Sequence, residues 1–245
     1  MTHHTVAVFL SLHDDSCILL FMAQYEIEIK TLLGEKANAE ALKNQMLERD
    51  LSCAHINTNK QLNHYFAGGD IQKLFPEIAS LFAEEAKEKL VYIAERGTNF
   101  SIRSRQKNDS VLLVVKASVD SGSSSNSVSR LEFEEEIPLT LGELDQILLA
   151  TGFEYQAKWS REREEYAYKG LNVCIDKNAG YGYLAEFEKV IDDESIIADA
   201  RDEIDAAMEE LGVFELTQDR LERMFAFYNE NWPEYYGTEK TFIIE

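Results

Sequence analysis

Short stretches in which charged and apolar side chains alternate constrain the fold of this chain more than any other feature. The first is YEIEIK, in which two isoleucines separate three charged residues, Glu26, Glu28 and Lys30. Successive side chains on a β-strand point to opposite faces, so these three ionisable groups share one face. Neighbouring carboxylates repel each other, and this face therefore needs a positively charged partner.

Charged residues recur with the same period of two on most of the other predicted strands. For any one strand, such a face is most simply exposed to solvent. The repetition instead favours an antiparallel sheet closed into a barrel, because a wide barrel can keep a polar, wet interior. The basic members of the set are Lys30, Arg103, Arg105, Lys116, Arg130, Arg161 and Arg163, and the acidic members are Glu26, Glu28, Glu132, Glu134, Asp176, Glu186 and Glu188.

The residue types in this set predict the ligands of such an interior. The bases would bind a polyanion, and the acids would bind divalent cations, because Mg²⁺ prefers carboxylate and phosphate oxygens. The chain as a whole has a net charge of −21 from 24 basic and 45 acidic residues. That charge argues against a protein that coats nucleic acid or binds an anionic membrane, since both need a basic surface.

The remaining patterns predict an α+β fold whose helices lie outside the sheet. Apolar stripes predict helices at 35–49, 72–90 and 141–150, the last capped by Thr140, and a helical region from 193 to 235. Gln61, Asn63 and Tyr65 alternate with apolar neighbours in a predicted strand at 61–68. The other predicted strands lie at 99–106, 111–118, 129–137, 154–168, 171–178 and 181–191, with a flexible serine-rich loop at 120–129.

The cysteines, the histidines and the N-terminal segment indicate the cellular compartment of the protein and the extent of its domain. The three cysteines are widely spaced and the five histidines form no metal-binding motif, which indicates a reduced, cytoplasmic protein without a zinc site. The apolar runs before residue 22 are too short to cross a membrane, and no basic segment precedes them. We expect residues 1–21 to be a disordered extension or a misread start, and residues 22–245 to form a single domain.

The charged motifs, taken in order, resemble those of the CYTH or triphosphate tunnel metalloenzyme superfamily. The series begins with ExExK at Glu26/Glu28/Lys30, RxR at Arg103/Arg105 and a lysine, Lys116, that ends a strand. It continues with RxExE at Arg130/Glu132/Glu134, a second RxR at Arg161/Arg163, an isolated aspartate, Asp176, and a final ExE at Glu186/Glu188. The resemblance implies a closed eight-stranded antiparallel tunnel and Mg²⁺- or Mn²⁺-dependent work on a small triphosphate. ATP, thiamine triphosphate and tripolyphosphate are the candidates, and a homodimer remains open.

The resemblance also implies a role for each residue in the set. The acids would bind the metal, the arginines and Lys116 would contact phosphates, and Lys30, desolvated beside other cations, would be the general base. One departure concerns the strand at 154–168, where Lys158 competes with Arg161 for the inward register.

Three functions fit this site. In a triphosphatase, water attacks the terminal phosphorus, and this function is favoured because it needs only the tunnel. In an adenylyl cyclase of the class IV type, the ribose 3′-hydroxyl of ATP attacks the α-phosphorus and pyrophosphate leaves. That reaction needs a nucleoside pocket, for which the aromatic candidates are Tyr65, Phe66, Phe100 and Tyr166. The third function is a non-catalytic polyphosphate-binding module, which would not need so many acids.

Overall fold

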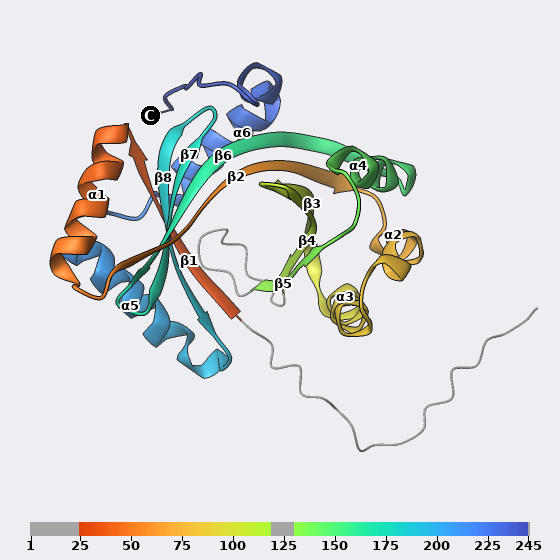
Figure 1. Ribbon diagram of the computed structural model, residues 1–245, viewed down its shortest axis with the longest axis horizontal. Helices are drawn as coiled ribbons and strands as arrows, with labels where there is room; N and C mark the ends of the chain where they lie inside the picture. Colours follow the sequence, from red (N-terminus) through yellow and green to blue (C-terminus); the bar gives the residue numbers. More distant parts are fainter. Residues whose placement is uncertain (1–24, 119–129, 245) are drawn as a thin grey trace, which may run out of the picture.

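Eight antiparallel strands form one strongly curved sheet with the strand order β1-β8-β7-β6-β2-β3-β4-β5 (Figure 1). The computed structural model describes residues 25–118 and 130–244, so the predicted extension at 1–21 and the loop at 120–129 lie outside the described residues. The strands are β1 (Tyr25–Gly34), β2 (Ala54–Gly68), β3 (Thr98–Lys107), β4 (Ser110–Ser118), β5 (Arg130–Glu136), β6 (Phe153–Tyr168), β7 (Leu171–Asn178) and β8 (Gly182–Ile191).

Six helices and two short 3₁₀ turns connect or follow these strands within the described residues. The predicted helix at 72–90 is wrong as one element, because the chain becomes extended at Phe82, whose buried ring packs edge-on against Phe133 at 5.4 Å. The elements are α1 (Lys36–Arg49), α2 (Ile71–Ile78), η1 (Ala79–Leu81), α3 (Glu84–Arg96), α4 (Leu141–Ala150), η2 (Glu194–Ile196), α5 (Ile197–Glu210) and α6 (Gln218–Tyr235).

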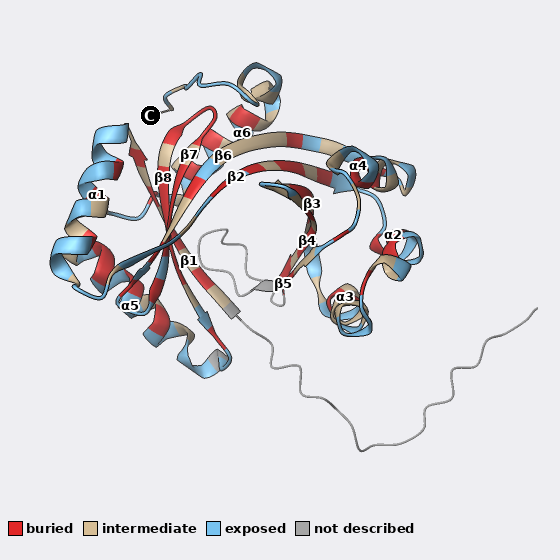
Figure 2. Ribbon diagram, in the orientation of Figure 1, coloured by how far each residue is buried: buried red, intermediate tan, exposed pale blue. Residues whose placement is uncertain are grey.

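The outer face of the sheet carries the apolar core. Helices α1 and α5 cover the half formed by β1, β7 and β8, and helices α2, α3 and α4 cover the half that contains β3 and β4 (Figures 1 and 2). Ile27 and Ile29, the isoleucines of the first alternating stretch, are 4% and 0% exposed in this core. The alternation therefore places the charged residues of the same strand on the inner face.

The sheet is not closed by backbone hydrogen bonds, which differs from the closed barrel expected from the sequence. Within the described residues, β1 and β5 are its two edges and do not pair with each other. Side chains span the gap instead. Lys116 of β4 lies 2.9 Å from Glu26 on β1 and 2.9 Å from Glu132 on β5. The shared ammonium thus links the two edge strands, which a ladder of backbone hydrogen bonds would join in a closed barrel.

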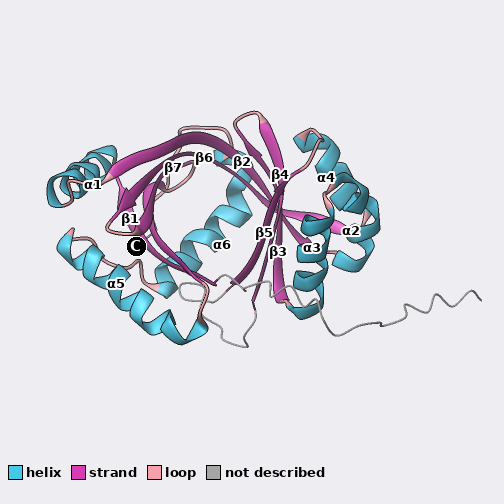
Figure 3. Ribbon diagram, turned by 60° about the horizontal axis from the view of Figure 1, so that its bottom comes forward, coloured by secondary structure: helices cyan, strands magenta, loops and turns pink. Residues whose placement is uncertain are grey.

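Helix α6 runs across the space that the sheet encloses (Figure 3). Its buried residues Leu221 and Met224 pack with Tyr181 and Leu184 near the β7–β8 turn, forming a third apolar cluster. The sheet and α6 together therefore surround an interior space, called the lumen below. No helix among the described residues is long and apolar enough to cross a membrane.

Candidate active site

The lumen is a cavity of about 600 Å³ on the inner face of the sheet. Every strand contributes to it, and α6 adds Leu221, Phe225 and Asn229. The structure describes all but one of the predicted site side chains, the exception being Arg130. The lining includes Glu26, Glu28, Lys30, Arg103, Arg105, Lys116, Glu132, Glu134, Arg161, Arg163, Glu186 and Glu188. One inward-facing register on eight strands brings these distant residues together.

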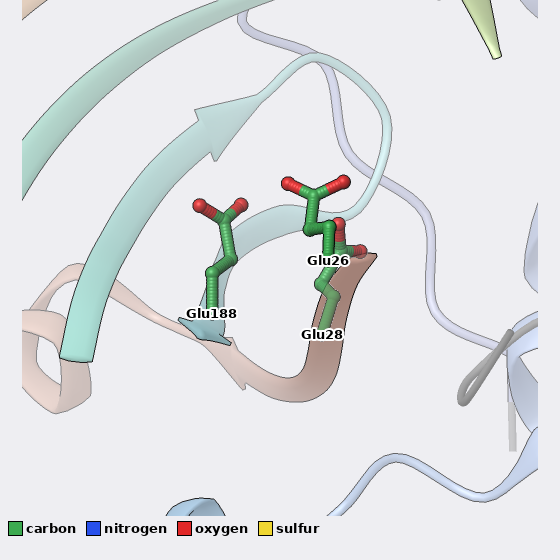
Figure 4. A group of neighbouring side chains, drawn as sticks. All are labelled: Glu26, Glu28 and Glu188. Atoms are coloured by element: carbon green, nitrogen blue, oxygen red, sulfur yellow. The ribbon is translucent and has the colours of Figure 1, made fainter. Parts of the chain in front are cut away.

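Three carboxylates meet at one point of the lumen. Oxygens of Glu26 and Glu28 from β1 and of Glu188 from β8 lie within 4.8 Å of one another (Figure 4). Burial is the main cause that raises the pKa of Glu188 to about 7, and the neighbouring charges of Glu186 and Glu26 add to it. A cation bound among the three carboxylates would offset the repulsion between their negative charges, because a bound metal becomes the largest local charge.

The donor set of this carboxylate trio fits Mg²⁺ or Mn²⁺. All three donors are hard oxygen atoms, which these ions prefer over nitrogen and sulfur. A small divalent ion also keeps several waters or substrate oxygens, so three protein carboxylates leave room for phosphate. Glu26, Glu28 and Glu188 are therefore the residues that would hold the cation.

The other predicted metal ligands do not join the trio, and each of them also lies against a basic side chain. Glu134 accepts a hydrogen bond from Arg105 Nη1 at 2.7 Å, and Glu132 lies beside Lys116. Glu186 pairs with Arg163. Burial raises the pKa of Glu186, but the charges of Arg163, Lys30 and Arg161 outweigh it and strongly lower that pKa. These acids offset the positive charges of the arginines and the lysine that they contact.

Asp176 is the most deeply placed of the predicted acids, with 1% of its surface exposed. Its carboxylate accepts hydrogen bonds from Arg161 Nη1 and from Nε and Nη2 of Arg163, each at 2.7 Å. A carboxylate that accepts from two arginines fixes the direction of both guanidinium groups. Asp176 is therefore placed to orient the arginines, and it lies apart from the trio.

Lys30 lies between acidic neighbours on adjacent strands. Its ammonium forms an ion pair with Glu28 on β1, and its Nζ lies 3.8 Å from Glu186 Oε1 on β8. Lys30 thus connects the carboxylate trio with the arginine cluster. Its predicted role as general base stays a prediction.

The register of β6 removes the ambiguity between Lys158 and Arg161. Arg161 pairs with Asn178 across the β6–β7 ladder and lines the lumen. Lys158 instead lies 4.0 Å from the centre of the Tyr155 ring, outside the lumen lining. Arg161 and Arg163 are thus the inward pair of this strand.

Sequence reasoning missed the layer that supports the arginines. On β2, the buried amides of Gln61 and Asn63 accept hydrogen bonds from Arg161 Nε at 2.8 Å and from Arg105 Nε at 2.6 Å. The sequence shows these amides at alternate positions, but they are uncharged, so the pattern of alternating charges did not include them. Lys107 and Glu165 also line the lumen, and their ion pair was not expected.

Of the four aromatic candidates for a nucleoside pocket, Tyr65 lines the lumen and the other three do not. Phe66 lies in the apolar core, and the Tyr166 hydroxyl donates to Glu164 on the other face of β6. Phe100 is 37% exposed. Trp159 also lines the lumen.

Comparisons with known proteins agree with this architecture. The sequence profile of the CYTH domain matches residues 85–221. No curated protein matches the sequence significantly. A conserved protein from Pyrococcus furiosus superposes with a TM-score of 0.56 at 18% identity, over 78% of this chain and 92% of its own.

Two further solved structures show the same fold. One is the PH1012 protein of Pyrococcus horikoshii, with a TM-score of 0.55 and 16% identity, over 79% of this chain and 96% of its own. The other, from Vibrio parahaemolyticus, is provisionally assigned as an adenylate cyclase; it has a TM-score of 0.55 and 16% identity, over 83% of this chain and 99% of its own. At these identities, the likeness concerns the fold.

Proposed function

Because this chain belongs to the CYTH domain family, we propose that it is a divalent-metal-dependent enzyme that hydrolyses a small triphosphate inside the lumen. One observation carries the proposal. The carboxylate trio and a cluster of arginines and lysines share a single cavity of about 600 Å³. That combination suits a polyanion and a bridging cation, and Mg²⁺ and Mn²⁺ are the cations expected.

In the proposed reaction, the arginines bind the triphosphate and hold it in line. Their planar guanidinium groups offer two parallel hydrogen bonds to phosphate oxygens, which an ammonium cannot do. Phosphoryl transfer needs mostly positioning and neutralisation of charge. A cation held by Glu26, Glu28 and Glu188 would supply further neutralisation of the phosphate oxygens.

The chemical step transfers the terminal phosphoryl group to water. The water oxygen bonds to the terminal phosphorus, and the bond from that phosphorus to the bridging oxygen breaks. The water proton passes to the neutral amine of Lys30, and the bridging oxygen leaves as part of the diphosphate product. The position of Lys30 in the lumen lining, next to the trio, supports this role.

Cyclisation of ATP is the second candidate, and a neighbouring cavity favours it. A space of about 1170 Å³ adjoins the lumen and shares Gln61, Arg161, Asn178 and Tyr181 with its lining. A nucleoside could occupy that space while its triphosphate lies in the lumen. The 3′-hydroxyl would then attack the α-phosphorus and release pyrophosphate.

One experiment separates these functions. The protein is incubated with tripolyphosphate, thiamine triphosphate or ATP, each with Mg²⁺ or Mn²⁺, and the products are separated by chromatography. Orthophosphate supports the hydrolase, and cyclic AMP with pyrophosphate supports the cyclase. Binding of the triphosphates without either product would leave a non-catalytic module and would reject the proposal.

A further inference from the structure

Arg103 differs from the other lumen arginines in how it is held. Arg105, Arg161 and Arg163 each form an ion pair with a carboxylate, whereas no carboxylate among the described residues pairs with Arg103. In the part of the chain that the structure describes, its Nε donates only to Ser101 Oγ, at 3.4 Å. A guanidinium in a lumen needs some partner, because removing a charge from water is costly.

The face of Tyr65 provides that partner. The Arg103 guanidinium carbon lies 4.4 Å from the centre of the Tyr65 ring, well within the range of a cation–π contact. Cross-strand pairing sets this contact, because Tyr65 on β2 lies directly opposite Arg103 on β3. The ring attracts the cation without neutralising it, so the charge of Arg103 stays available to an anion.

The ring itself is fixed by an aromatic column that leads to α6. Tyr65 packs against Trp159 with ring centres 5.9 Å apart, and Trp159 stacks on Tyr228 at 3.9 Å. Tyr228 is fully buried in α6, and its hydroxyl donates to the backbone oxygen of Lys158 at 2.9 Å. The position of Arg103 is therefore defined from α6 through three aromatic rings.

The electrostatics of the phenol agree with this placement. Burial raises the pKa of Tyr65, but the guanidinium groups of Arg103, Arg161 and Arg105 outweigh it and lower that pKa. The phenol thus lies in the positive field of three arginines. An anionic phosphate would be attracted to the same place.

We propose that Tyr65 is a positioning residue whose ring face holds Arg103 in place to receive a phosphate group of the substrate. The inference rests on the proposed function, because it takes the lumen to be the site of a triphosphate. It assigns the role to the face of the ring and gives the hydroxyl no part. Phenylalanine at position 65 should therefore preserve substrate binding, and an aliphatic side chain there should weaken it.

Calorimetric titration with tripolyphosphate in EDTA tests this without involving the metal. We expect Tyr65→Leu to weaken binding about tenfold, a factor equal to about 1.4 kcal/mol and within the range of a desolvated cation–π contact. Tyr65→Phe should restore the affinity to within about twofold. In an Arg103→Ala background, Tyr65→Leu should weaken binding by no more than about twofold, because the residue it positions is gone.

A matched control is the cation–π pair on α3, outside the lumen lining, where the Arg96 guanidinium lies 5.8 Å from the ring of the half-buried Tyr92. Tyr92→Leu should leave the affinity unchanged. Three results would overturn the inference: equal losses for Tyr65→Phe and Tyr65→Leu, unchanged affinity in a folded Tyr65→Leu, or a full tenfold loss in the Arg103→Ala background. If Tyr65→Leu fails to fold, Tyr65→Met takes its place, and the result for Tyr65→Phe still applies.

The outcomes also separate this inference from the proposed function. Binding of tripolyphosphate without turnover of any triphosphate would reject the hydrolase and leave the role of Tyr65 standing. Turnover with an affinity that is insensitive to Tyr65→Leu would reject only the role of Tyr65. A wild-type protein that binds no tripolyphosphate would reject both.

Discussion

Two carboxylates lie beside the ammonium of Lys30, and their charges affect whether this residue can act as a general base. Glu28 and Glu186 both lie beside the amine. Carboxylates favour the charged form of an amine, which can bind phosphate but cannot accept a proton. A cation that takes up the charge of Glu28 would weaken this effect. Lys30 could therefore serve as a base chiefly when the cation is bound.

Replacing Lys30 by arginine separates the base from the phosphate binder. Arginine keeps the positive charge, but its guanidinium cannot lose a proton near neutral pH. We predict that Lys30→Arg lowers kcat for tripolyphosphate by about 100-fold or more, the usual contribution of a general base, and keeps KM within about threefold. Steady-state kinetics with Mg²⁺ would measure both constants, with Lys60→Arg on the exposed surface as control. A raised KM with unchanged kcat would show that Lys30 only holds the substrate.

Behind the arginine-bearing strands lies a buried polar network that connects separate elements. Asp145 of α4 accepts hydrogen bonds from Ser104 Oγ on β3 at 2.5 Å, from the Tyr155 hydroxyl on β6 at 2.6 Å, and from His64 Nδ1 on β2 at 2.7 Å. His64 Nε2 lies 2.8 Å from the Tyr236 hydroxyl at the end of α6. Burial raises the pKa of Asp145, but the hydrogen bonds from His64, Ser104 and Tyr155 outweigh it and lower that pKa.

This network gives a pH-dependent prediction for stability. A carboxyl group whose pKa is lowered on folding stabilises the protein above its unfolded pKa of about 4, and that contribution is lost as the pH falls through the folded pKa. We predict that Asp145→Asn costs about 2–4 kcal/mol at pH 7, because it removes a buried, hydrogen-bonded charge. The difference from wild type should shrink below pH 4.

Thermal unfolding followed by circular dichroism at pH 7 and pH 3.5 would measure this cost. Asp202→Asn, on the exposed side of α5, is the matched control and should change stability by less than about 0.5 kcal/mol. A cost for Asp145→Asn that is the same at both pH values would contradict the account of this network.

The molecule as a whole depends on the seam between β1 and β5, where Lys116 replaces backbone pairing. Burial lowers the pKa of Lys116, but the charges of Glu132 and Glu26 outweigh it and raise that pKa. We predict that Lys116→Met destabilises the protein by about 2 kcal/mol or more, because it leaves two neighbouring, half-buried carboxylates without their shared cation. Amide hydrogen exchange should speed up about tenfold or more in β1 and β5.

Hydrogen exchange followed by mass spectrometry would locate the change. The exposed Lys60–Glu162 pair supplies the control, and Lys60→Met should leave exchange in β1 and β5 unchanged. Faster exchange that is spread evenly over all strands would show that Lys116 acts on global stability and not on the seam.

The sequence was informative wherever charge alternated with apolar residues. The repetition of period-two charge over several strands was enough to predict an inner charged face, and the α+β class and the antiparallel sheet of eight strands are confirmed. The helix cap predicted at Thr140 is also present, because its hydroxyl accepts a hydrogen bond from the Glu143 backbone amide. Such features depend on local geometry, which a sequence pattern carries directly.

Features that depend on distant residues could not be predicted. The missing pairing of β1 and β5 follows from where the two edge strands lie after the whole sheet has curved, and no local pattern encodes their relative position. The hydrogen bonds from two arginines of the neighbouring strand to Asp176 could not be predicted, and its role as a metal ligand stays a prediction. Lone charges in a sequence do not reveal which opposite charge they will meet.

Binding of Mn²⁺ to the carboxylate trio is the central claim, and electron paramagnetic resonance titration tests it most directly. The account predicts that the wild-type protein binds Mn²⁺ and that Glu28→Gln, which keeps the size of the side chain but removes its charge, weakens this binding at least tenfold. Glu48→Gln, on the exposed face of α1, should bind Mn²⁺ like the wild type. Equal Mn²⁺ affinity in Glu28→Gln and wild type would contradict the assignment of the trio as the metal site.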